Sequence, residues 1–236
     1  MIFVILIVCG AAALLWYVHE KIKAYSVRAV LIKAVVSFFF VAVGVFGLHA
    51  LSVYGETNPV GVLIVLGLVC GLLGDIWLDL KYVFPEKDRV FTYAGFGAFG
   101  VGHVFYIGGM LVKYYTADAY FYVLVAFILA IVVSIGNAAL EKPMKLSYGD
   151  MKLTVIIYGI LLFATLFVSG ALALAYGWRE VALNLLFAGA VLFTASDLVL
   201  SKTYFGEGHE RPIDFILNYF TYYPAQFLIA SSLMFM

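Results

Sequence analysis

Charge is scarce in this sequence of 236 residues. Only 12% of the residues are charged, 65% are apolar, and the mean hydropathy is +1.08. A domain that folds in water usually has about a quarter of its residues charged, so the shortage excludes a chain made mainly of soluble structure. Basic and acidic residues number 14 each, and the formal net charge is zero. This balance gives no indication of a nucleic-acid partner, which would favour a basic chain.

Cysteine is also scarce, and both cysteines, Cys9 and Cys70, lie inside apolar runs. Two such residues exclude a disulfide framework and a cysteine-rich metal cluster. A catalytic zinc ion needs about three protein ligands, whereas His19, His49 and His209 lie near breaks between the apolar runs. The sequence therefore predicts no metal site.

Long apolar runs fill most of the chain instead. A helix needs about 20 residues to cross a bilayer, and backbone groups in hydrocarbon must find partners within their own segment. We therefore predict an all-α polytopic membrane protein in which one domain, residues 1–236, has eight transmembrane helices. The first run lacks the preceding basic residues of a signal peptide, so we interpret it as the first transmembrane helix. The expected spans are roughly residues 1–18, 34–54, 60–80, 91–112, 120–139, 153–176, 181–201 and 213–236.

The basic residues are distributed unevenly among the connections. The connections after the first, third, fifth and seventh spans hold 12 of the 14, and the others hold only Lys113 and Arg179. Because basic residues are enriched in cytoplasmic loops, we expect both termini on the non-cytoplasmic side. The expected location is the cell (inner) membrane of a bacterium.

Two carboxylates lie at matching depth in the expected spans. Asp75 is about 9 Å and Asp197 about 7–8 Å from the cytoplasmic ends of the third and seventh helices, at about 1.5 Å per residue. A charge in hydrocarbon is costly and usually faces a cavity or a pathway. A pair of this kind can act as general acid and general base. Asp79 shares the face of Asp75 but lies one turn closer to water, so we expect it to be an interfacial charge near Lys81.

Further polar residues lie on other expected helices. A lone histidine in a bundle is often a packing group, and tyrosines near an interface often form an aromatic belt. Taken together, however, the polar residues on these helices predict a polar cavity that opens toward the cytoplasmic leaflet. Its expected substrate-binding residues are Lys33 at the inner mouth of the second helix, His103 and Tyr106 on the fourth, Tyr158 on the sixth, and Tyr222 and Gln226 on the eighth.

Four short segments carry a resemblance to a known family: LGDIWL at 73–78, FGVGHVFY at 99–106, GAVLFTASD at 189–197 and TYYPAQ at 221–226. They resemble the YhhN-like lysoplasmalogenases. They fall in order on the third, fourth, seventh and eighth helices, and the eight-helix plan covers the whole chain. Lys33 is similar to the family's basic residue on helix two, and Tyr158 to its helix-six tyrosine.

The resemblance implies hydrolysis of the vinyl-ether bond of lysoplasmalogen. The products are a fatty aldehyde and glycerophosphoethanolamine or glycerophosphocholine, and no cofactor is implied. Protonation of the vinyl ether needs a positioned acid, and the resulting cation needs a carboxylate or an activated water, which Asp75 and Asp197 would supply. The expected partners are the lysophospholipid, with its phosphate near Lys33, and the lipid bilayer.

Two other functions are compatible with membrane carboxylates. An intramembrane aspartyl protease also uses paired helix aspartates, and GLLGD at 71–75 is similar to its glycine–aspartate signature with altered spacing. A proton-coupled transporter also uses such groups, although inverted repeats and broken helices are not visible in the sequence. Release of aldehyde, cleavage of a peptide and uptake of a solute would distinguish the three.

Overall fold

Long α-helices account for nearly all of the computed structural model, which describes residues 1–23, 25–52, 58–206 and 212–236. Helix starts follow local sequence: Ser26 Oγ accepts a hydrogen bond from the Ala29 amide, and Asn58 caps the helix that begins at Pro59. Within the described ranges the long helices are α1 (Ile2–Lys23), α2 (Val27–Ser52), α3 (Pro59–Val83), α4 (Asp88–Tyr114), α5 (Tyr120–Ala139), α6 (Lys152–Ala175), α7 (Val181–Phe205) and α8 (Pro212–Ser232).

The chain is an integral membrane protein, as predicted. In the described part of the chain, seven helices, α1 to α7, are long and apolar enough to cross a membrane. Helix α8 has a similar length of 21 residues, but it carries polar side chains such as Asn218, Tyr222 and Gln226, which are buried inside the protein. The all-α prediction is therefore confirmed, while the crossing of the membrane by α8 stays a prediction.

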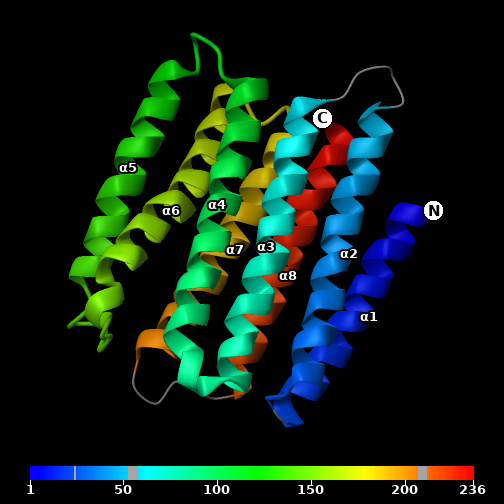
Figure 1. Ribbon diagram of the computed structural model, residues 1–236. Helices are drawn as coiled ribbons and strands as arrows, with labels where there is room; N and C mark the ends of the chain where they lie inside the picture. The colour runs from blue at the N-terminus through cyan, green and yellow to red at the C-terminus, as the bar shows by residue number, and fades with distance from the viewer. Residues whose placement is uncertain (24, 53–57, 207–211) are drawn as a thin grey trace.

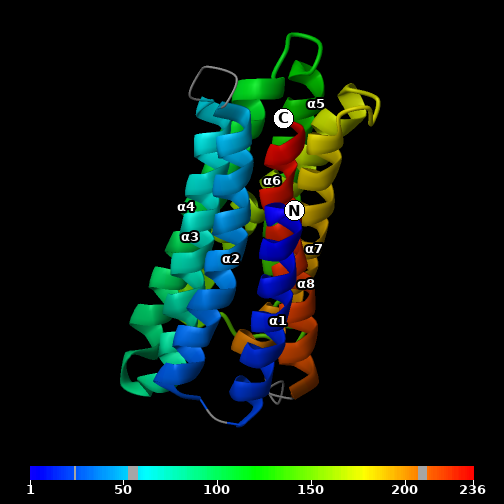
Figure 2. The same cartoon turned by 90° about the vertical axis from the view of Figure 1, so that its right-hand side faces the viewer.

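Six of the helices form a closed ring. Going round it, α2 packs against α3, α3 against α4, α4 against α6, α6 against α7, α7 against α8, and α8 against α2. Helix α1 packs outside the ring against α2 and α8, and α5 packs outside against α6. Figures 1 and 2 show these two helices at opposite edges of the bundle. The ring encloses the space in which polar side chains can meet away from lipid.

The basic connections gather at one end of the bundle. In Figure 1 the α1–α2, α3–α4 and α5–α6 connections lie at the lower end, where α7 also ends and α8 begins. The α4–α5 and α6–α7 connections lie at the upper end. The placement of both termini on the non-cytoplasmic side stays a prediction, and His209 and Arg211 lie outside the described residues.

Several helices extend beyond the apolar runs that predicted them. Helix α1 continues to Lys23 instead of ending near residue 18, and α2 begins at Val27 instead of near residue 34. Lys33 therefore lies in the second turn of α2 and is buried, rather than standing at an open mouth. In these added turns, Lys21 and Lys33 find carboxylate partners inside the bundle.

Glycines on α3 make room for side chains from its neighbours. A methyl group at Gly67 would collide with the ring of Tyr106 from α4, and one at Gly71 would lie 2.5 Å from the amide nitrogen of Gln226 from α8. The missing Cβ atoms thus let polar side chains from α4 and α8 reach the centre of the ring.

Candidate active site

Asp75 on α3 is held by three donors. Its Oδ2 atom accepts hydrogen bonds from Ser37 Oγ at 2.6 Å and from the Tyr222 hydroxyl at 2.9 Å. The Lys33 Nζ atom lies 3.4 Å from Oδ1. All these partners present hydrogens or positive charge, so the arrangement fits an ionised carboxylate.

A hydrogen-bonded chain leads away from Asp75 through three of the predicted residues. The Tyr106 hydroxyl donates to Gln226 Oε1 at 2.9 Å, and Gln226 Nε2 donates to the Tyr222 hydroxyl at 3.1 Å. Tyr222 must then use its own hydrogen for Asp75. The chain therefore fixes the direction in which Tyr222 donates, and it joins α4, α8 and α3.

Asp79 lies in the interior, so the expectation of an interfacial charge near Lys81 is wrong. Its Oδ2 atom accepts from the Tyr17 hydroxyl at 2.7 Å, and its Oδ1 atom lies 2.9 Å from Lys21 Nζ and 3.2 Å from Lys33 Nζ. Lys81 pairs with Asp88 instead, at 3.3 Å. Because Asp79 follows Asp75 by four residues, it faces the same interior, and α1 covers it on the outside.

The paired charges form one buried group, which we call the charge cluster. It consists of Lys21, Lys33, Asp75 and Asp79, and their side chains are at most 6% exposed. Two ammonium groups and two carboxylates sum to zero, which is the condition under which charges are tolerated at such depth. Lys33 is the link, since it lies within ion-pair distance of both aspartates.

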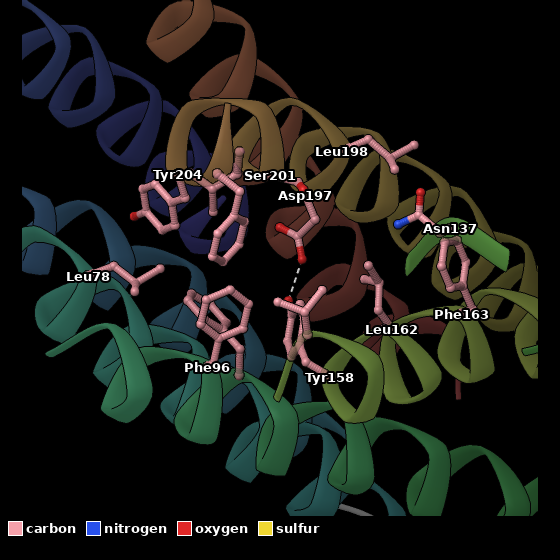
Figure 3. Close-up of a pocket in the computed structure, with 15 residues that line it drawn as sticks. Leu78, Phe96, Asn137, Tyr158, Leu162, Phe163, Asp197, Leu198, Ser201 and Tyr204 are labelled. Carbon is pink, nitrogen blue, oxygen red and sulfur yellow. Dashed lines mark hydrogen bonds between the residues drawn. The ribbon is translucent and has the colours of Figure 1, made fainter. Parts of the chain in front are cut away.

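Asp197 on α7 has a different environment. The Tyr158 hydroxyl of α6 donates to its Oδ2 atom, as the dashed line in Figure 3 marks. Among the described residues, no lysine or arginine forms an ion pair with it, and Tyr158 is the hydrogen-bond donor found for its side chain. The side chain is half-buried. Asp197 thus has much less support for a negative charge than Asp75 has.

Two neighbouring cavities meet at Asp197. The more polar one is lined by both Asp75 and Asp197, and its empty volume, open solvent included, is about 430 Å³. The other is mostly apolar, has an empty volume of about 630 Å³ and runs between α6 and α7 toward Asn137 of α5 (Figure 3). Both cavities are lined by Leu78, Phe99, Asp197, Leu200 and Tyr204.

His103 lies behind Tyr158 in the interior of the bundle. The Thr165 hydroxyl donates to the Leu161 carbonyl at 3.0 Å, so the Nδ1 atom of His103 must donate to Thr165 Oγ1, also at 3.0 Å. The Nε2 atom is left as a buried acceptor for which the described residues provide no donor. The imidazole ring packs edge-on against the Tyr158 ring, with centroids 5.7 Å apart.

The predicted residues therefore occupy two positions. Lys33, Tyr158 and Tyr222 line the cavities, together with the two aspartates. His103, Tyr106 and Gln226 lie behind that lining within the described structure. In the same part of the chain, no group of three or more histidine, cysteine, aspartate or glutamate side chains could hold a metal ion.

Comparison with known proteins identifies the family. The model of the YhhN family matches residues 28–233, which include α3 to α8 in full and most of α2. The chain belongs to the YhhN family. No curated protein and no solved structure matches it. In this YhhN protein, α1 lies outside the matched residues, although it supplies Tyr17 and Lys21 to the charge cluster and its surroundings.

Several residues of this YhhN site escape prediction from composition and depth alone. The hydroxyl of Tyr219 lies 2.9 Å from the hydroxyl of Tyr17. The residues missed in this way are Asp79, Lys21, Tyr17, Ser37 and Tyr219. A usable signal is the repeated spacing of four residues, which puts two side chains on one helix face. The pairs with this spacing are Tyr17/Lys21, Lys33/Ser37, Asp75/Asp79 and Tyr222/Gln226.

Proposed function

We propose that this YhhN protein hydrolyses the vinyl-ether bond of a lysoplasmalogen. The reaction comes from the family resemblance. One observation supports it: Asp75 and Asp197 line the same cavity in unlike electrostatic settings. Asp75 has an ammonium group and two hydroxyl donors, whereas Asp197 has one hydroxyl donor within the described structure. Paired carboxyls in unlike settings are the usual arrangement of an acid and a carboxylate that stays ionised.

We assign the role of general acid to Asp197. It gives its proton to the vinyl carbon that is β to the ether oxygen, and the electron pair of the double bond forms the new C–H bond. The resulting oxocarbenium ion is stabilised by the Asp75 carboxylate. Water adds to the carbon next to oxygen and returns a proton to Asp197. The hemiacetal then breaks into the fatty aldehyde and the glycerophospho alcohol.

The two cavities suit the two halves of such a substrate. The apolar cavity along α6 and α7 takes the hydrocarbon tail, and the polar cavity takes the glycerol end. Tyr158 positions Asp197, while Tyr222, with Gln226 and Tyr106 behind it, positions Asp75. Because both neighbours of Lys33 are carboxylates, we assign it to the charge of Asp75 rather than to the substrate phosphate.

The test is aldehyde release from lysoplasmalogen by purified protein in lipid. Acid–base groups contribute about 10²–10⁴-fold, so Asp75→Asn and Asp197→Asn should each lower kcat by at least about 10²-fold at matched amounts of folded protein. The double variant should be little worse than the poorer single variant, because residues that act as a unit are not additive. Asp88→Asn, at the exposed rim, is the matched control and should keep normal turnover.

Near-normal turnover in either Asp75→Asn or Asp197→Asn would remove the paired-carboxylate mechanism. If the unaltered protein releases no aldehyde but cleaves a peptide or drives uptake of a solute, the reaction itself is wrong. The two failures are separate, since the first concerns the residues and the second the substrate.

A further inference from the structure

Asp79 and Lys21 have no part in the reaction just proposed, yet both are buried in the bundle beside Asp75. Lys21 Nζ lies 2.9 Å from Asp79 Oδ1, and the Tyr17 hydroxyl lies 2.7 Å from Oδ2. The ammonium group of Lys21 also lies over the rings of Tyr25 and Tyr82, at 4.7 and 4.4 Å from their centroids. Asp79 lies one helical turn from Asp75, and these contacts fix both its carboxylate and the ammonium group of Lys21. They indicate that the pair has a function of its own.

The connection to Asp75 runs through Lys33. Asp79 Oδ1 is shared by Lys21 and Lys33, and Lys33 also reaches Asp75 at 3.4 Å. Asp79 therefore compensates the charge of Lys21 and part of the charge of Lys33. Without it, two ammonium groups would face the single carboxylate of Asp75. With it, Asp75 has one ammonium group beside it and the charge cluster is neutral.

We infer that Asp79 is a positioning residue for Asp75, and that it acts by balancing the charge of Lys21. The inference rests on the proposed function, in which Asp75 stabilises a positively charged oxocarbenium ion. An uncompensated positive charge a few ångströms away opposes that cation, because Coulomb interactions between buried charges are weakly screened. The balance of the cluster thus sets how well Asp75 can stabilise the cation.

The experiment is a pair of substitutions that first breaks the charge balance and then restores it. Asp79→Asn leaves one extra positive charge, and at matched amounts of folded protein kcat should fall about 10-fold or more, as expected for a unit charge at an effective dielectric constant of about 20. KM should change little, because the effect belongs to the transition state. Lys21→Met combined with Asp79→Asn makes the cluster neutral again and should recover most of the lost kcat.

Three outcomes would overturn the inference. They are a normal kcat in Asp79→Asn, a kcat in the double variant as low as in Asp79→Asn, and a rise of KM with kcat unchanged. If Asp79→Asn does not fold, the double variant Lys21→Met/Asp79→Asn is the test. Because its cluster is neutral, it should fold and be active, and an inactive double variant would overturn the inference. The experiment also separates the two proposals: Asp197→Asn measures the proposed acid chemistry, and the melting temperatures of Asp79→Asn and the double variant measure charge balance without any substrate.

Discussion

Lys33 illustrates at the scale of a single residue how neighbours decide a role. A lysine near the end of a membrane helix suggests a phosphate ligand when only the sequence is known, since an ammonium group is a point charge for phosphate. In the structure its Nζ atom lies between two carboxylates, at 3.2 and 3.4 Å. Its charge is already compensated inside the protein.

Lys33→Gln should therefore affect kcat more than KM. Without the ammonium group, the Asp75 and Asp79 carboxylates repel each other, and one of them is driven to take up a proton. We expect kcat to fall about 10-fold or more, with a smaller change in KM. Steady-state kinetics of aldehyde release measures both. A large rise in KM with normal kcat would contradict this assignment and indicate that Lys33 binds the substrate phosphate.

Tyr158 gives a second prediction at this scale. Its hydroxyl is the donor to Asp197, and it stabilises the carboxylate that remains after the acid has given up its proton. A hydrogen bond to a charged group is worth about 1.5–3 kcal/mol, so Tyr158→Phe should lower kcat about 10-fold or more. Tyr93→Phe removes a comparable tyrosine–aspartate bond at an exposed position and should leave kcat unchanged. Equal effects of the two substitutions would contradict the assignment.

At the scale of the elements, the apolar runs predict the middle of each helix better than its ends. The run that ends near residue 18 gives no sign that α1 continues to Lys23, because Lys21 is charged. It is tolerated there because Asp79, distant in sequence, neutralises it. Asp75 and Asp197 could be found from depth alone, but Lys21 and Asp79 could not, since their burial depends on how the helices are arranged around the ring.

The contact between α3 and α4 leads to a prediction about stability. Gly67→Ala puts a methyl group against the rigid ring of Tyr106, and overpacking of this kind costs about 1–3 kcal/mol. Gly97→Ala on α4 is the matched control, since no described atom lies within 4 Å of the added methyl group. Thermal unfolding in detergent should show a lower melting temperature for Gly67→Ala and no loss for Gly97→Ala. Equal losses would mean that the close approach is not what Gly67 provides.

At the scale of the whole molecule, the gathering of basic connections at one end predicts the orientation in the membrane. The α4–α5 connection lies at the upper end in Figure 1 and the α5–α6 connection at the lower end. Tyr115 belongs to the first and Ser147 to the second, and both are exposed. In a variant without Cys9 and Cys70, Tyr115→Cys should react with an impermeant reagent in intact cells. Ser147→Cys should react only after the cells are opened. Labelling of both from outside would reverse or refute the orientation.

The neutrality of the charge cluster has an electrical consequence. A membrane potential does work of about 2.3 kcal/mol on each elementary charge per 100 mV crossed. Three ion pairs, Lys21–Asp79, Lys33–Asp79 and Lys33–Asp75, link the four charges of the cluster, which sum to zero, so the voltage exerts almost no net force on them as a group. The fold is therefore as well suited to an energised membrane as to a depolarised one. Asp79→Asn would leave the cluster with a net positive charge, so the free energy of unfolding of this variant would depend on the membrane potential.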